Sequence, residues 1–525
     1  MAESEQKPNT KKAKQAKSSG LLKSSSIVSA MTLLSRVLGL ARDVFVASYF
    51  GARADAFFVA FKIPNFFRRL FAEGAFSVAF VPVLSEYKVQ EKDIKSLVRS
   101  VSGTLLAILG PFTILAVAAA PILTWVFAPG FASDANKFAL TSDLLRITFP
   151  YLLLISLTAF YGSVLNTYGQ FAVPAITPVL LNICLIVATL YFTPWFNEPL
   201  MALAWGVLLA GVTQLAFQLP FVMKLGLLAL PKPAFADVGV RRILKLMVPA
   251  LFGVSVSQIN LLLDILLASF LETGSVSWLY YSDRLTQLPL GVFAIALAVV
   301  ILPSLSKKHA DKNKEEFAIT LDWGVRMVLL IGLPSALALI VLAQPLMITI
   351  FYRGEITPYD VEKMAMSLRA YSAGLLAFML IKVLAPGYFA RLDTKTPFKI
   401  GIKAMVANMA LNIPLVLMLA HVGLALATTL SAYLNAILLF LGLRKLGVYV
   451  VQPGWWAWIL RIIFSSVLMT IVIFWLNPGE QAWLAFSEWQ RMGWTGLLVA
   501  AGVFTYGASL MVLGVRGRHL LVAKR

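Results

Sequence analysis

The strongest constraint on this chain is a succession of apolar segments that fills most of its length. We count fourteen such segments in the sequence, and each is long enough to cross about 30 Å of hydrocarbon. Backbone polar groups find no water inside a bilayer, so each segment is expected to form an α-helix that satisfies its own hydrogen bonds. The sequence therefore predicts an all-α polytopic membrane protein with fourteen transmembrane helices. Their approximate limits are residues 25–50, 55–86, 98–128, 141–166, 173–193, 200–223, 246–271, 276–305, 319–351, 364–390, 398–420, 423–443, 455–476 and 492–515.

Composition agrees with a membrane protein and argues against several other classes. The 525 residues are 59% hydrophobic and 13% charged, with a mean hydropathy of +0.82, unlike a soluble domain. The net charge of +20 does not indicate a nucleic-acid-binding protein, because the basic residues lie in short connections rather than on one face. The single Cys184 and three scattered histidines suggest neither a disulfide framework nor a metal site. We find no nucleotide-binding loop or hydrolase motif, so we expect neither an enzyme nor a cofactor.

The distribution of basic residues predicts the orientation of the helices. Lys and Arg are concentrated in alternate connections, and such connections face the cytoplasm. Both termini are then cytoplasmic, which requires an even number of spans. Residues 1–24 are polar and Lys-rich and are predicted to be a disordered basic tail, with a second cytoplasmic tail at residues 516–525. The basic connections are residues 88–99, 224–245, 307–314, 391–399 and 444–445.

An internal repeat divides most of the chain into two similar halves. A shift of 221 residues lays Asp43 on Asp264 and Pro82 on Pro303, and a later shift of 223 lays Arg146 on Arg369. Six spans followed by six similar spans in the same orientation predict two six-helix lobes, related by a pseudo-two-fold axis along the membrane normal, with a central cavity between them. The expected organisation is an N-lobe at residues 25–223, a cytoplasmic linker at 224–245, a C-lobe at 246–443 and two additional helices at 455–515.

Residues 35–74 combine an apolar sequence with many charged side chains. In a lipid-facing helix each central Arg, Lys or Asp costs roughly 2.5–3.5 kcal/mol, so these side chains should face a protein interior or a water-filled cavity. Residues seven apart fall nearly on one line of a helix, which places Asp55, Lys62 and Arg69 on one stripe. The alternative is that the charges near a helix end extend to the lipid headgroups. The charged residues considered are Arg36, Arg42, Asp43, Asp55, Lys62, Arg68, Arg69 and Glu73.

The second half contributes less positive charge to the predicted cavity. Arg36 and Arg42 align with the uncharged Ser257 and Leu263, and the second half supplies Arg284 instead. An ion pair with a carboxylate such as Asp283 or Asp264 is the structural alternative for Arg284. An excess of Arg and Lys suits an anionic group, and the planar fork of Arg suits phosphate in particular. Without nucleotide machinery, energy for transport must come from the membrane potential or from a gradient of a monovalent ion.

Five segments carry the next observation: SRVLGLARDVFVA, ADAFFVAFKIPNFFRRLFAEGAFSVAFVPVLSEYK, FALTSDLLRITFPYLLLISL, GVSVSQINLLLDILLASFLETGSVSWLYYSDRL and KVLAPGYFARLDTKTPFKI. They resemble the MurJ family of lipid II flippases, and the resemblance covers nearly the whole chain. It implies the fold of the multidrug/oligosaccharidyl-lipid/polysaccharide exporter superfamily, with a groove for the lipid tail on the last two helices. It also implies a function, which is to move the undecaprenyl-pyrophosphate-linked peptidoglycan precursor from the cytoplasmic to the periplasmic leaflet of the bacterial inner membrane by alternating access.

The resemblance also implies roles for individual residues and partners. The expected partners are lipid II, membrane lipids and cell-wall synthesis proteins, with no nucleic acid. The substrate-binding residues implied are Arg36, Arg42, Arg69 and Arg284, and those assigned to gating or ion pairing are Asp43, Asp55, Lys62, Glu73 and Asp264.

Other functions remain open from the residues alone. An ion-coupled exporter of another lipid-linked oligosaccharide or of a drug would share the fold, although a carrier of cationic drugs should present an excess of carboxylates. A membrane transferase would need paired carboxylates or a His near the headgroups, and none is obvious. A scaffold for cell-wall synthases would leave the charges within the membrane unexplained.

Overall fold

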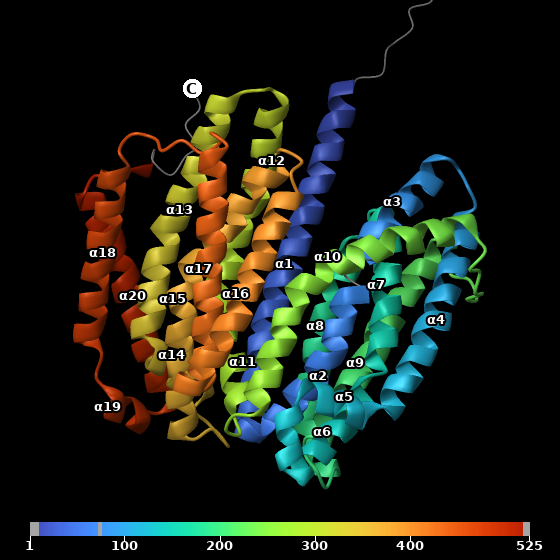
Figure 1. Ribbon diagram of the computed structural model, residues 1–525, viewed down its shortest axis with the longest axis horizontal. Coiled ribbons are helices and arrows are strands. Elements are labelled where there is room, and N and C mark those ends of the chain that lie inside the picture. Colours follow the sequence, from blue (N-terminus) through green and yellow to red (C-terminus); the bar gives the residue numbers. More distant parts are fainter. Residues whose placement is uncertain (1–9, 72–75, 518–525) are drawn as a thin grey trace, which may run out of the picture. The chain divides into compact units, whose positions relative to one another are not determined.

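The computed structural model describes residues 10–71 and 76–517, and every regular element in these residues is a helix (Figure 1). Shorter 3-10 and π-helical turns are η1 (Gly51–Ala54), η3 (Pro129–Ser133), η4 (Ala188–Phe192), η5 (Thr193–Trp195) and η6 (Leu290–Ala294). The α-helices are α1 (Thr10–Phe50), α2 (Asp55–Arg68), α3 (Phe76–Val89), α4 (Ile94–Ala118), α5 (Ala120–Phe127), α6 (Ala135–Thr148), α7 (Tyr151–Thr167), α8 (Ala172–Val187), α9 (Met201–Lys224), α10 (Val238–Ser269), α11 (Ser275–Pro289), α12 (Ile295–Ala310), α13 (Lys314–Val341), α14 (Ala343–Phe351), α15 (Pro358–Phe389), α16 (Lys395–Leu419), α17 (His421–Lys445), α18 (Trp455–Leu476), α19 (Glu480–Ala485) and α20 (Glu488–Val512).

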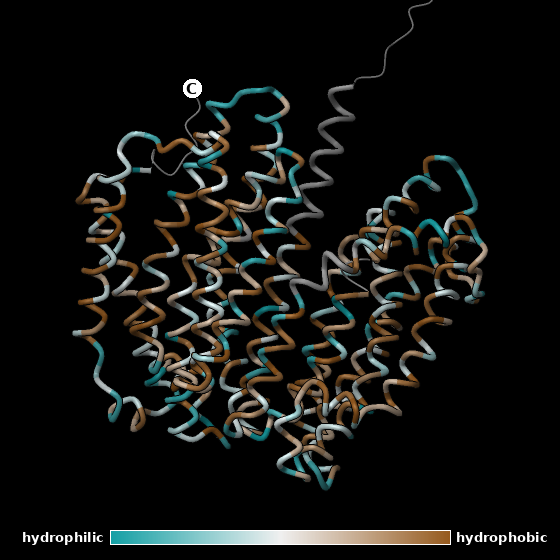
Figure 2. The backbone as a smooth tube through the Cα atoms, viewed as in Figure 1, coloured by the Kyte–Doolittle hydropathy of each residue, from teal (hydrophilic) through white to brown (hydrophobic). Residues whose placement is uncertain are grey.

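The helices confirm the predicted all-α polytopic class. Within the described residues, twelve stretches are long and apolar enough to cross a membrane. One of them, Ile27–Val89, covers the first two predicted segments. The predicted segment at 246–271 corresponds to α10, whose apolar part is Gln258–Ser269. The structure is therefore consistent with fourteen spans. Figure 2 shows hydrophobic residues along the helices and hydrophilic ones gathered at the connections.

The chain forms two compact units that interleave along the sequence. Unit 1 contains the residues up to Val46, Ala60–Thr124 and Ala139–Ser255. Unit 2 contains Ala47–Val59, Trp125–Phe138 and the chain from Val256 onward. Two short stretches from the first half of the sequence therefore belong to unit 2. They are the junction of α1, η1 and α2, and the region around η3.

Each unit has its own apolar core around one central helix. In unit 1, α7 packs against α3, α4, α8 and α9, and Phe80 and Phe160 are fully buried between these helices. In unit 2, α15 packs against α11, α12, α13, α14 and α17, around buried residues such as Leu321, Leu375 and Leu443. Close van der Waals packing of this kind is what holds helices together where lipid replaces water.

The backbone supports the predicted internal repeat. Residues in the left-handed conformation end helices at equivalent places in the two halves, with the same offsets of 221 and 223 residues found in the sequence. Left-handed residues commonly terminate helices, because they satisfy the last carbonyl groups. The pairs are Glu91 (φ 51°) with Lys312 (φ 55°), Gly226 (φ 69°) with Gly447 (φ 66°), and Gly169 (φ 78°) with Leu392 (φ 62°).

The N-terminal basic stretch differs from the prediction of a disordered tail at residues 1–24. Helix α1 begins at Thr10 and runs without interruption to Phe50, while residues 1–9 lie outside the described part of the chain. The stretch is rich in Lys, Ala and Gln, which are strong helix formers. It also extends an existing helix, so it avoids the cost of nucleating a new one.

The last two long helices, α18 and α20, run side by side, and α18 packs on α13 (Figure 1). A buried carboxylate fixes the link that leads to them. Asp322 of α13 accepts hydrogen bonds from the Tyr449 hydroxyl (2.8 Å), the Trp455 indole N–H (2.5 Å) and Arg326 Nε (2.8 Å). Arg326 also donates to the Gln452 carbonyl. This network anchors the helix pair to the rest of unit 2.

Candidate substrate site

Arg42 and Asp43 form a buried ion pair on α1 within unit 1. The Arg42 Nε and Nη2 atoms donate to Asp43 Oδ1 at 2.9 and 2.5 Å, and Nη1 donates to Asn182 Oδ1 at 3.1 Å. Asn182 lies on α8 and donates in turn to the Ser35 carbonyl at 2.9 Å. Arg42 is 8% exposed and Asp43 1% exposed. The cluster shows that these charges lie inside the protein and do not extend to lipid headgroups.

Arg36 lies on α1, six residues before Arg42, and is half-buried. It makes no hydrogen bond or ion pair to the described part of the chain. A half-buried guanidinium in an apolar helix keeps all five N–H donors for a partner that the described residues do not supply. Arg36 is therefore well suited to contact an anionic substrate.

The charged residues at the end of α2 have different surroundings. Lys62 is half-buried, whereas Arg69 is exposed and lies beyond the end of α2, where a wider π-helical turn begins. Arg68 donates to Asn65 Oδ1 at 2.8 Å and lines a cavity of about 320 Å³ inside unit 1, whose walls combine polar side chains with a larger apolar surface. Arg68 is one of the charged residues noted in the sequence but is not among the predicted substrate-binding residues; Asn65, three residues earlier on the same helix face, is a signal that could have indicated it. Glu73 lies outside the described residues.

The cavity beside Arg68 is also lined by polar side chains from α7, α8 and α9. Gln214 accepts from the Tyr151 hydroxyl at 3.3 Å and donates to the Thr177 carbonyl at 2.7 Å. Gln218 is 1% exposed, and its Oε1 atom has no hydrogen-bond partner among the described residues. A buried carbonyl oxygen of this kind usually contacts water. The cavity therefore extends polar surface from the end of α2 into the helix bundle of unit 1.

Asp55 joins the beginning of α2 to the beginning of α11 within unit 2. Its Oδ1 atom accepts from the Ser277 N–H (2.8 Å) and hydroxyl (2.7 Å), and its Oδ2 atom accepts from the Gly274 N–H (2.7 Å). The Lys137 ammonium forms an ion pair with Oδ2 at 3.3 Å. Asp55 is 1% exposed. The carboxylate satisfies N–H groups that the first turn of a helix otherwise leaves unpaired.

The second half contributes Arg284 and two carboxylates, all on helices of unit 2. Arg284 is half-buried on α11 and directly follows Asp283, which accepts a hydrogen bond from Gln287. Asp264 of α10 accepts from Asn412 Nδ2 at 3.3 Å. Asn412 also donates to Asn408 Oδ1, four residues earlier on α16. Unit 2 thus contains a polar network within the span, built mainly from acceptors and amides.

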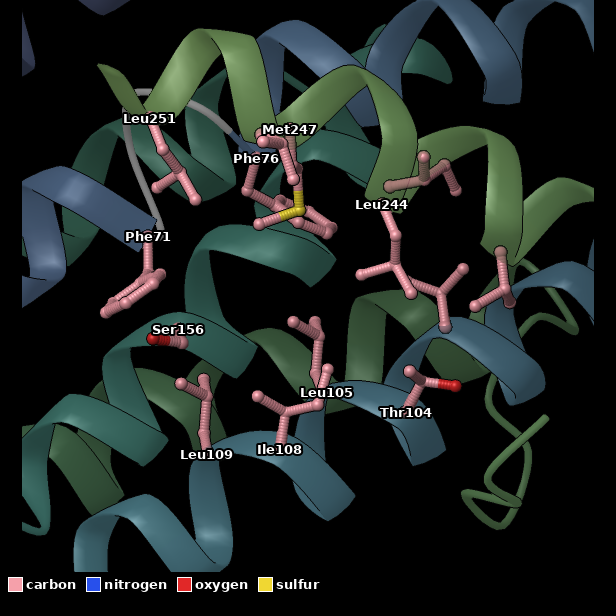
Figure 3. A pocket seen from close by; sticks show the side chains of 14 residues that line it. Phe71, Phe76, Thr104, Leu105, Ile108, Leu109, Ser156, Leu244, Met247 and Leu251 are labelled. Carbon is pink, nitrogen blue, oxygen red and sulfur yellow. The ribbon is translucent and has the colours of Figure 1, made fainter. Parts of the chain in front are cut away.

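A second pocket in unit 1 has the opposite character. Its volume is about 210 Å³, and its lining is almost entirely apolar (Figure 3). Leu105 and Ile108 on α4 face Leu244 and Met247 on α10, with Ser156 of α7 on a further wall. Such a pocket suits a hydrocarbon chain and offers almost no donors to an anion. In the described part of the chain, no three His, Cys, Asp or Glu side chains come together in the way a metal ion requires.

Repeated helical halves, many apolar helices and buried charges within them define a polytopic membrane transporter. The fold is shared with a multidrug resistance MATE family transporter of the MOP superfamily in an inward-facing conformation. That structure has 16% identity and a TM-score of 0.62, and the match covers 78% of this chain and 94% of the transporter.

The family model described as lipid II flippase MurJ matches residues 46–492, and the chain belongs to this family. A probable lipid II flippase MurJ from Vibrio cholerae serotype O1 is 51% identical over 514 residues, covering 96% of this chain and 98% of the relative. A lipid II flippase MurJ from Burkholderia cenocepacia is 42% identical, covering 90% of each chain. A structure of lipid II flippase MurJ in an inward closed conformation has 28% identity and a TM-score of 0.77, covering 92% of this chain and 98% of that one.

Proposed function

We propose that this protein moves lipid II, the undecaprenyl-pyrophosphate-linked peptidoglycan precursor, across the inner membrane to the periplasmic leaflet. The single observation that carries the proposal is family membership over nearly the whole chain. The buried cationic cluster of α1 supports it, because a pyrophosphate needs positively charged donors in a site shielded from lipid. The protein is accordingly a transporter and needs no catalytic group.

The proposed pyrophosphate-binding residues are Arg36, Arg42, Arg69 and Arg284. Arg36 makes no internal hydrogen bond or ion pair in the described chain, so it can direct its whole fork to phosphate oxygens. Arg42 is already held by Asp43 and Asn182. Asp43 therefore acts as a stand-in anion, which holds the guanidinium in place until the substrate competes for the same donors.

This competition gives Asp43 a role in gating. A ligand shifts a conformational equilibrium only through contacts that differ between the two states. Phosphate binding to Arg42 would release Asp43 and so weaken the state in which the two residues are paired. We propose that this exchange is one step of alternating access. Asp55, Lys62, Glu73 and Asp264 are proposed to act through ion pairing.

The charged residues also suggest an energy source for transport and the side of the membrane on which the termini lie. Transport is expected to use the membrane potential or a monovalent ion, for which the half-buried Asp264 with Asn412 offers oxygen ligands inside unit 2. Both termini are proposed to be cytoplasmic, because the basic connections then lie inside.

The helix pair α18 and α20 is proposed to bind the lipid tail. Its outer surface is apolar and exposed at residues such as Phe464, Ile471, Val503 and Phe504. The network around Asp322 holds this pair on α13. Cell-wall synthesis proteins remain proposed partners, since they would consume the lipid II delivered outside.

The proposal is tested by measuring how much lipid II is accessible in the periplasmic leaflet after depletion of the protein and complementation with variants. Arg36→Ala should abolish flipping, and Arg36→Lys should be partly active at best, because Lys retains the charge and loses the fork. Loss of one charge-assisted hydrogen bond, worth roughly 1.5–3 kcal/mol, should weaken lipid II binding about tenfold to a hundredfold.

A matched control is Arg146→Ala. Arg146 is exposed and paired with Asp143 at 2.6 Å, so its removal should leave flipping unchanged. Both variants should insert at normal levels. If the Arg36 variants bind lipid II normally, or are simply missing from the membrane, the arginine has a structural role and the pyrophosphate site lies elsewhere.

A further inference from the structure

Unit 2 contains a basic pocket near the residues at which α12, α15 and α17 end. Figure 1 labels these helices. Its volume is about 480 Å³. The charged lining comes from Lys308, His309, Lys312 and Lys314 around the turn from α12 to α13, and from Arg391 after α15. The link that follows α17 supplies another wall. None of the described lining residues is acidic.

The turn between α12 and α13 is well defined. Lys312 is left-handed, with φ 55°, and its N–H donates to the His309 carbonyl at 3.0 Å. The next residue, Asn313, caps α13 by accepting from the Glu316 N–H at 3.0 Å. These contacts fix the backbone from which the basic side chains extend.

The cations of the pocket are only partly neutralised by the chain. Lys308 lies 3.4 Å from the Glu316 carboxylate and donates to the Thr320 hydroxyl. The side chains of Lys312, Lys314 and Arg391 make no hydrogen bond or ion pair within the described residues. Asp393 lies near Arg391, but Thr396 donates to its carboxylate at 3.0 Å. Positive charge therefore exceeds negative charge at this pocket.

The equivalent place in the first half is closed differently. There Lys88 donates to the Thr167 carbonyl at 3.0 Å, and its ammonium lies 4.1 Å from the centre of the Tyr168 ring. The offsets of 221 and 223 residues place His309 at the position of Lys88, and Arg391 at that of Tyr168. Among the described residues, the second half therefore has no counterpart of the Lys88–Tyr168 cation–π contact. His309 and Arg391 stand in its place; both donate hydrogen bonds, and neither can act as an anion for the other.

We propose that this pocket binds the phosphate of an anionic phospholipid headgroup in the adjacent leaflet. Transmembrane helices end at headgroup depth, and basic pockets between their ends bind anionic lipid headgroups. Arg391 supplies a planar fork for phosphate oxygens, and Lys312 supplies a compact charge. Phe317 and Val448 add apolar surface for the glycerol and the first acyl carbons. The preference of basic connections for the cytoplasm accounts for the presence of Lys and Arg in these connections. It does not account for basic side chains from two different connections lining one cavity.

The test uses the purified full-length protein in nanodiscs of phosphatidylcholine, with and without phosphatidylglycerol. Retention of phosphatidylglycerol after detergent extraction and the apparent Tm are both measured. The wild-type protein should retain this lipid and melt at a higher temperature when it is present. Lys312→Gln combined with Arg391→Gln should weaken retention roughly tenfold or more. Arg391→Tyr alone, which copies the first half, should act in the same direction.

The matched control is Lys95→Gln combined with Arg99→Gln, which removes one Lys and one Arg from exposed positions on α4. It should retain phosphatidylglycerol like the wild type. Equal loss in the control, or unchanged retention in the pocket variants, overturns the proposal. Binding of glycerol 3-phosphate and of inorganic phosphate is measured separately. If these bind and phosphatidylglycerol has no effect, the proposal that the ligand is a lipid is wrong. Lipid II is absent from the assay, so the result does not depend on the flippase proposal.

Discussion

Replacing Asp55 with Asn tests whether this residue supports the fold or acts on the substrate. The amide oxygen of Asn can still accept from the N–H and hydroxyl of Ser277. Its NH2 group would then face the Gly274 N–H and the Lys137 ammonium, so two charge-assisted hydrogen bonds of roughly 1.5–3 kcal/mol each are lost. Lys137 keeps its hydrogen bond to the Thr273 hydroxyl, which moderates the loss. We expect Asp55→Asn to lower the free energy of unfolding by about 3–5 kcal/mol.

The assay is thermal unfolding of the detergent-solubilised protein, followed by intrinsic fluorescence, together with lipid II binding at low temperature. Asp143→Asn is the matched control, because the side chains of the Asp143–Arg146 pair are 45% and 46% exposed. An exposed pair contributes about 0–1 kcal/mol, so the control should melt near the wild type. An Asp55→Asn protein as stable as the wild type, yet unable to bind lipid II, would refute the structural reasoning and assign Asp55 to the substrate.

Three further outcomes are expected. Tyr449→Phe should destabilise the protein by about 1.5–3 kcal/mol, seen as a lower Tm, because it removes a hydrogen bond to the buried Asp322 carboxylate; an unchanged Tm contradicts this. The hydrogen bonds from Thr396 lower the pKa of Asp393, so its stabilising effect is fully present above the unfolded pKa of about 3.9 and is lost as pH falls through the lowered value. Asp393→Ala should accordingly lower Tm at neutral pH by more than it does in acid, and a pH-independent difference argues against the assignment. A reporter fused after Lys312 should be cytoplasmic, and a periplasmic signal there would break the fourteen-span topology.

The sequence predicts most of the architecture, because a membrane leaves few alternatives. A run of apolar residues long enough to span must be helical, so hydropathy alone locates the segments and the class of fold. The repeat is equally accessible, since matches such as Asp43 with Asp264 keep a constant offset. Backbone conformation at Glu91 and Lys312 then follows the same offset. The cost of an intramembrane charge also correctly indicated that Arg42 and Asp43 are buried.

Contacts between distant segments could not be read from the sequence. Helical spacing grouped Asp55 with Lys62 and Arg69, but the partners of Asp55 come from residues 222 positions away. Asn182, which holds Arg42, is an uncharged residue in an apolar helix and carries no local signal. The choice between neighbouring basic residues at the end of α2 depends on where the helix ends, and periodicity does not determine that. Gating assignments, including that of Asp43, stay predictions.

Because unit 2 combines early and late parts of the sequence, some of its contacts can form only late in synthesis. Ser48 and Asp55 leave the ribosome early, whereas their partners Glu355 and Ser277 follow roughly 300 and 220 residues later. At about 5–20 residues per second, that interval lasts roughly 10–60 s. For most of this time the Asp55 carboxylate can pair only with Lys137, because the N–H groups of Gly274 and Ser277 are made later. A nascent chain halted midway therefore holds Asp55 without the helix N–H groups that it binds in the finished protein.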